Sequence, residues 1–110
     1  AIVIISGQTD IISDGVRTGL VKNGCPIMSR ITGSGCMLTA LTAAFAAANQ
    51  ENKFEAALSA VSLMGVCGEA AFEKLKTCGG GNSSFRNYLI DAVFNMDGNT
   101  LERRADYEIY

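Results

Sequence analysis

The sequence contains no histidine and no tryptophan, and it has one proline in 110 residues. Its four cysteines, at positions 25, 36, 67 and 78, form no C-x-x-C pair, so a zinc site is not expected. Apolar residues make up 48% of the chain, which excludes a disordered polypeptide. The cysteine pattern does not match a small secreted domain held by disulfides, so we expect a reducing, cytoplasmic compartment.

Clustered positive charge is also absent. The net charge is −2, and the longest basic run, Arg103-Arg104, is flanked by Glu102 and Asp106. Nucleic acids and anionic membranes bind clusters of Lys and Arg, so we expect neither as a partner. No signal peptide is visible, and no apolar run reaches membrane-spanning length without polar breaks.

The first third of the chain predicts β structure. Ala1 to Ile5 is a continuous apolar run, typical of a strand inside a sheet that is covered on both faces. Because the chain opens directly on this run, we expect its neighbouring strands to lie on sequence outside these residues. Asp10 to Ser13 and Val16 to Leu20 are short strand candidates around Asp14-Gly15, a hairpin signal. Pro26 to Ile31 predicts a further strand.

Three helices are predicted in the remainder. Cys36 to Ala48 is apolar on all sides, which indicates a helix buried between other elements. A second helix spans about Phe54 to Leu75, and a third runs from an N-cap at Ser83 or Ser84 to about Phe94. Within the first two helices, Cys36 and Cys67 are expected to be small buried hydrophobic residues.

Glycines and turns complete the pattern. Gly65 and Gly68 each cost the second helix about 1 kcal/mol relative to Ala, and we interpret them as sites of close packing. Asp97-Gly98-Asn99 predicts a turn. Leu101 to Tyr110 predicts a polar tail with an edge strand at its end.

The most informative element is a short loop between a strand and a long helix, Thr32-Gly33-Ser34-Gly35-Cys36. A helix start leaves about four backbone N–H groups without partners and carries roughly half a positive charge. Glycines at 33 and 35 remove side chains that would keep an anion from those amides. The arrangement suits a phosphoryl group, although G-x-G before a helix is weak evidence alone, and the GxxxxGK[ST] pattern of a P-loop is missing.

Three separated segments carry a more specific pattern: residues 2–15 followed by Asn23-Gly24, residues 31–41, and residues 81–85 with the helix after them. In this order and spacing they resemble the hydroxyethylthiazole kinase family. The resemblance covers essentially all 110 residues and corresponds to less than half of the family's chain. Other ribokinase-like enzymes end this loop with Asp, and Cys36 is similar to the thiazole kinase branch.

The resemblance implies an α/β protein with a three-layer α/β/α ribokinase-like fold. Residues 1–110 would be the C-terminal part of a single kinase domain. The implied activity transfers the ATP γ-phosphoryl group to the hydroxyl of 4-methyl-5-(2-hydroxyethyl)thiazole, for thiamine biosynthesis by salvage. The family uses Mg²⁺ and forms trimers with active sites at subunit boundaries, so the implied partners are the thiazole alcohol, ATP, the N-terminal portion of the enzyme and two further copies.

Residue roles follow from the same resemblance. Ser6 stands where the family has Thr or Ser near the nucleotide phosphates, and Gly33 stands at the position that contacts the thiazole. Gly33, Ser34, Gly35 and Cys36 would form an anion hole. Cys36 takes the catalytic position, where it would orient the substrate hydroxyl and accept its proton late. The alternative for Cys36 is a buried cysteine without chemistry, and no metal ligand is implied within this chain.

Two departures from the family pattern and three other functions remain open. Ser34 replaces a more usual Ala or Thr, which is a mild change because the loop works through backbone amides. Asn82 and Ser83 replace an expected Pro-Gly, so no ligand role is predicted for that loop. The alternative functions are another ribokinase-like small-molecule kinase, an ATP-dependent repair enzyme of the same fold, and a catalytically silent fragment that needs its N-terminal half.

Overall fold

The structure is a computed structural model that describes residues 1–31 and 33–110. Thr32, part of the predicted loop, lies outside the described residues. In chain order the elements are β1 (Val3–Ile5), β2 (Asp10–Ser13), β3 (Thr18–Val21), the 3₁₀ helix η1 (Pro26–Arg30), α1 (Ser34–Ala48), α2 (Lys53–Cys78), α3 (Asn82–Asn95), α4 (Gly98–Arg104) and β4 (Tyr107–Ile109).

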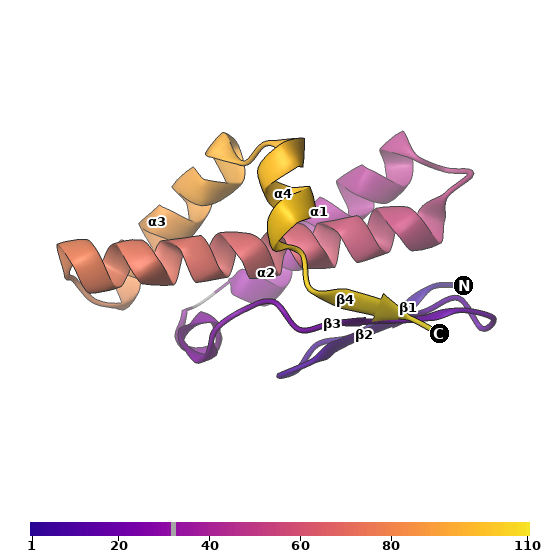
Figure 1. The fold of residues 1–110 in the computed structure, drawn as a ribbon, viewed down its shortest axis with the longest axis horizontal. Coiled ribbons are helices and arrows are strands. Elements are labelled where there is room, and N and C mark those ends of the chain that lie inside the picture. The colour runs from indigo at the N-terminus through magenta and orange to yellow at the C-terminus, as the bar shows by residue number, and fades with distance from the viewer. Residues whose placement is uncertain (32) are drawn as a thin grey trace.

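The strands form one antiparallel sheet in the order β1-β2-β3-β4, and the long helix α2 lies across one face of it (Figure 1). The predicted hairpin is confirmed: Ser13 pairs with Thr18, and Gly15 turns the chain with φ of 92°. Ile12 and Val21 are fully buried under α2, where they meet Phe54 and Val61. The sheet and α2 therefore share one core.

α2 also packs against α1 and α3, and a second core lies between these three helices (Figure 1). Phe85 and Leu89 of α3 are fully buried there, beside Cys67 and Ala71 of α2. This arrangement places the first turn of α1 and the first turns of α3 on the same central helix.

Buried Asn23 ties the end of β3 to two later elements. Its Nδ2 donates to Glu69 Oε1 at 3.1 Å and to the Arg104 carbonyl at 2.9 Å, and its Oδ1 accepts the Asp106 N–H at 2.6 Å. A Cβ on Gly65 would lie 2.6 Å from Asn23 Cβ and 2.7 Å from its carbonyl oxygen. The close packing predicted at Gly65 is confirmed, and its partner is the loop after β3.

The strand predicted over Pro26 to Ile31 is wrong, because residues 26–30 form η1. Proline lacks an N–H and is well suited to a first helical position, and the Met28 N–H bonds the Cys25 carbonyl at 3.2 Å. The free edge of β3 is taken by β4 instead, so the edge strand predicted near the C-terminus is confirmed.

Two shorter segments also differ from their predictions. The predicted turn at residues 97–99 opens α4: the Asp97 carboxylate caps this helix by accepting the Thr100 N–H at 2.7 Å. The N-cap of α3 is Gly81, and neither Ser83 nor Ser84 takes that place. The third predicted helix thus begins slightly earlier than expected, at Asn82. The helix α4 was not predicted, since residues 101–104 were expected to belong to a polar tail.

The prediction that the first long helix is buried on all sides is wrong for the described residues. No residue of α1 is buried, because this helix packs against α2 along one face and its opposite face is open. Val3 and Ile5 of β1 are likewise 56% and 59% exposed. Apolar surface beside β1 and α1 is thus left uncovered by the part of the chain that the structure describes.

Within the part of the chain that the structure describes, one helix, α2, is long and apolar enough to cross a membrane by length and composition. In the fold, 78% of its most apolar window is buried inside the protein. A helix at the centre of a protein core is buried in this way. Its burial accounts for the many small and apolar residues of α2.

We predict that Gly65→Ala destabilises the protein by about 1–3 kcal/mol, because the added methyl group would overlap the backbone and Cβ of buried Asn23. Gly98→Ala is the matched control, since nothing lies within 4 Å of a Cβ at that position. Urea unfolding of both variants measures the difference, and equal stability of the two would contradict the packing described at Gly65.

Candidate active site

The first turn of α1 is open to solvent. Gly33 is the N-cap, with φ of 93° and no side-chain cap, and the first helical bond runs from the Met37 N–H to the Gly33 carbonyl at 2.9 Å. A φ of this sign strains any residue with a Cβ, so glycine is required here. The N–H groups of Ser34 and Gly35 make no hydrogen bond with the described residues. Ser34 is half-buried and Gly35 is exposed, so an anion can approach this helix start from solvent.

Met28 fixes where this turn lies. Its side chain packs onto Gly68 of α2, where any Cβ would overlap the Met28 sulfur, and its carbonyl accepts the Ser34 hydroxyl at 3.1 Å. The close packing predicted at Gly68 is therefore confirmed, and it serves to hold η1. Because Ser34 points its hydroxyl back into the fold, only its backbone amide is presented at the open end of the helix.

Cys36 lies in the same first turn and is exposed. The expectation that it is a buried hydrophobic residue is wrong, because the helix side that carries it has no neighbour among the described residues. Cys67 behaves as expected: it is fully buried, and burial raises the pKa of its thiol to about 11. None of the four cysteines forms a disulfide. Cys36 and Cys67 therefore differ in solvent exposure and not in covalent bonding.

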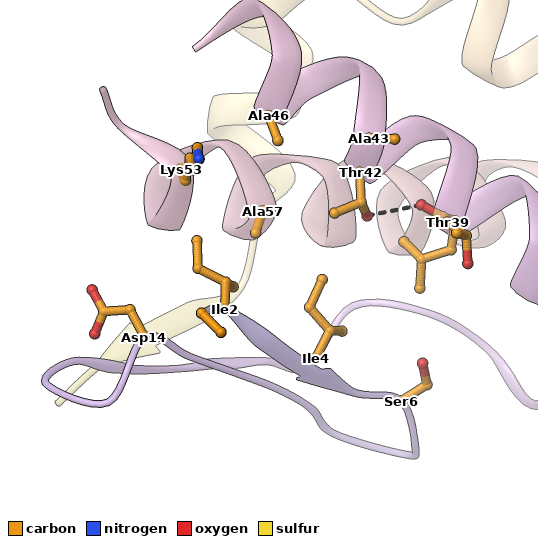
Figure 2. A pocket seen from close by; sticks show the side chains of 12 residues that line it. Ile2, Ile4, Ser6, Asp14, Thr39, Thr42, Ala43, Ala46, Lys53 and Ala57 are labelled. Carbon is orange, nitrogen blue, oxygen red and sulfur yellow. Dashed lines mark hydrogen bonds between the residues drawn. The ribbon is translucent and has the colours of Figure 1, made fainter. Parts of the chain in front are cut away.

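Ser6, in the turn after β1, lines a cavity of about 630 Å³ between β1 and α1. Figure 2 shows Ser6 at the same end of this cavity as Thr39 of α1, whereas Asp14 and Lys53 lie at the opposite end. Ile2, Ile4 and Ala57 lie between these ends, and together with Leu38 they give the cavity an apolar lining. Thr39 Oγ1 donates to the Gly35 carbonyl at 3.0 Å, so the Ser6 end lies one helical turn from the open amides.

The structure thus gathers Gly33, Ser34, Gly35 and Cys36 in one turn and places Ser6 beside the next turn of the same helix. Among the residues that the structure describes, none of 33–36 lines the cavity itself. No group of three or more His, Cys, Asp or Glu side chains in the described ranges could hold a metal ion.

Sequence reasoning missed one residue. Arg86 of α3 reaches the start of α1: its Nη2 would lie 4.0 Å from a Cβ on Gly33. Arg86 directly follows the residue 81–85 segment that carries part of the family pattern, and this adjacency was the signal available in the sequence. Its contact with the loop, however, depends on how α3 packs on α2.

Comparison with known proteins decides the family. A profile of the hydroxyethylthiazole kinase family matches residues 1–99. The chain belongs to the hydroxyethylthiazole kinase family. A Clostridium acetobutylicum protein named hydroxyethylthiazole kinase is 50% identical over all 110 residues, which are 40% of that protein. A Clostridium tetani protein of the same name is 41% identical over 105 residues, 96% of this chain and 37% of that protein.

The fold comparison agrees. The solved structure of a hydroxyethylthiazole kinase protein from Pyrococcus horikoshii OT3 matches with a TM-score of 0.90 at 34% identity, over 100% of this chain and 41% of that one. The predicted α/β class and the predicted family are confirmed. This hydroxyethylthiazole kinase family chain spans about 40% of the length of the relatives it matches. The roles assigned to Ser6 and to residues 33–36 stay predictions.

We predict that iodoacetamide modifies Cys36 and Cys78 of the native chain at least about tenfold faster than Cys67, because the thiolate is the reactive form and Cys67 is both buried and protonated at pH 8. Mass spectrometry after timed quenching measures the three rates. Denaturant should bring them close together. Rapid labelling of Cys67 in a sample that keeps its helical circular dichroism would contradict the packing of α2.

Proposed function

We propose that the full-length protein carrying this chain transfers the γ-phosphoryl group of ATP to the hydroxyl of 4-methyl-5-(2-hydroxyethyl)thiazole, as part of thiamine salvage. We call that protein the full-length enzyme below. The observation that carries the proposal is the start of α1 in a member of this family: a glycine-capped helix end with open amides, and an exposed cysteine beside them.

The anion hole consists, in this proposal, of Gly33, Ser34, Gly35 and Cys36. The charge that spreads over the phosphoryl oxygens during transfer is stabilised by amides and a helix dipole that are already oriented. Gly33 also contacts the thiazole ring, since its missing side chain leaves the loop open on that side. Ser6 binds the nucleotide from the end of the cavity beside Thr39, which agrees with its place near the first turns of α1.

Cys36 is the proposed catalytic residue. Its sulfur holds the substrate hydroxyl in line with the γ-phosphorus. As the new P–O bond forms, the bond to the ADP oxygen breaks, and the hydroxyl proton passes late to the sulfur, which accepts it as the thiolate and becomes a thiol. Phosphoryl transfer proceeds through a loose transition state that depends mainly on positioning and charge, so early removal of this proton is not needed.

The remaining parts of the proposal concern the whole protein. Residues 1–110 form the C-terminal part of one ribokinase-like domain, and the N-terminal portion covers the open faces of β1 and α1. The uncovered apolar side chains of β1 and the cavity beside it support this placement. We further propose that the protein is a cytoplasmic homotrimer, that Mg²⁺ accompanies ATP, and that its ligands come from outside this chain.

The function is tested by ADP formation that depends on the thiazole alcohol in the full-length enzyme. We predict that residues 1–110 alone show no turnover, because the open faces of β1 and α1 leave the substrate site incomplete. A coupled ADP assay measures both proteins. Turnover by the 110-residue chain would contradict the incomplete site, and a preference for another alcohol would favour a different small-molecule kinase of this fold.

We predict that Cys36→Ala in the full-length enzyme lowers kcat by about 10²–10⁴-fold and changes KM for the alcohol much less, since the sulfur acts mainly in the transition state. Cys36→Asp should keep much of the activity, because a carboxylate is also a proton acceptor. Cys78→Ala, an exposed cysteine at the far end of α2, is the control. An unchanged kcat in Cys36→Ala would remove this residue from the catalytic role.

A further inference from the structure

Arg86 stands at the open end of α1 although it belongs to another helix. The nearest heavy atom to a Cβ built on Gly33 is the Arg86 Nη2, at 4.0 Å, so the missing side chain at Gly33 leaves the space between the loop and the guanidinium free. Arg86 makes no hydrogen bond or ion pair with any described residue. Its charge is therefore not used to hold the described parts of the fold together.

The backbone position of Arg86 is set by buried neighbours, and its side chain is exposed. Phe85, immediately before it, and Leu89, three residues after it, are both fully buried against α2. The first turn of α1 is held on the same helix through Met28 and Gly68. Because both backbones are held on α2, packing places the Arg86 side chain within reach of Gly33.

The local electrostatics favour an anion. A cation close to a helix start is unfavourable by about 0.3–1 kcal/mol, because that end already carries partial positive charge. Here the guanidinium adds to the open end of α1, and neither α1 nor α3 has an acidic residue in its first turn. Positive potential from two sources thus converges on one small region without a compensating carboxylate on either helix.

We propose that Arg86 binds the terminal phosphates of the nucleotide while the first turn of α1 holds the phosphoryl group in transfer. This inference rests on the proposed function, since it assigns a further residue to the same site. A planar guanidinium can donate two parallel hydrogen bonds to phosphate oxygens, which orients a phosphate as well as attracting it. Arg86 is a nucleotide-binding residue here, and Cys36 keeps the proton transfer.

The test compares Arg86→Gln, Arg86→Lys and Arg103→Gln in the full-length enzyme. Arg103 is the matched control, because it is an exposed arginine of α4 that only reaches Thr100. For Arg86→Gln we expect KM for ATP and Kd for a non-hydrolysable ATP analogue to rise about tenfold. Affinity for adenosine, which has no phosphate, and the melting temperature should stay unchanged, and Arg86→Lys should recover part of the loss.

Each outcome decides between the claims. The inference would be overturned if KM for ATP and Kd for the analogue in Arg86→Gln lay within about twofold of their values in Arg103→Gln. It would also be overturned if Arg86→Gln lost as much affinity for adenosine as for the analogue, which would indicate a structural effect. If the unsubstituted full-length enzyme binds the analogue, loses this affinity in Arg86→Gln, and does not phosphorylate the thiazole alcohol, the inference stands and the proposed function fails. If the unsubstituted full-length enzyme phosphorylates the alcohol and Arg86→Gln leaves KM for ATP and Kd for the analogue unchanged, the proposed function stands and the inference fails.

Discussion

The contact between Met28 and Gly68 determines where the first long helix begins, and the candidate site depends on it. Gly68 has no side chain, so Met28 can rest directly on α2 and bring η1 with it. The Met28 carbonyl then receives the Ser34 hydroxyl, which ties the start of α1 to the same helix. One close approach in the core therefore positions a solvent-exposed row of amides. Each part of the candidate site is thus positioned by its packing on α2.

The charge at the start of α1 suits phosphoryl chemistry. Its N-cap is a glycine with positive φ, and no side chain of the described residues caps the leading amides. Elsewhere in the chain a helix start is closed: α4 is capped by Asp97, whose pKa is lowered chiefly by the Thr100 N–H that it accepts. Among the described helices, α4 is thus capped by a carboxylate, whereas the starts of α1, α2 and α3 have no side-chain cap. What sets the α1 start apart is the positive φ of its glycine N-cap and the exposed Cys36 in its first turn.

The sequence predicted the parts of the fold that local chemistry decides. Asp14-Gly15 predicts its hairpin because only glycine accepts the backbone angle needed there, and the family pattern around residues 31–41 placed the candidate site on the start of α1. Pro26 was misread as part of a strand, since apolar neighbours favour strand and proline at a helix start favours η1. The exposure of Cys36 and the approach of Arg86 to Gly33 depend on which helices pack on α2, and no local pattern encodes that.

β1 and α1 border the same cavity, and the open start of α1 lies one helical turn from the Thr39 end of that cavity. In this account, the protein portion that covers the open faces also encloses the site. The most direct measurement of the central claim is a crystal structure of the full-length enzyme with ADP, the thiazole alcohol and aluminium fluoride. The account predicts fluorine atoms about 2.7–3.1 Å from the amide nitrogens of residues 34–36, with the alcohol oxygen beside the Cys36 sulfur. Fluoride bound elsewhere, with those amides covered by protein groups, would contradict it.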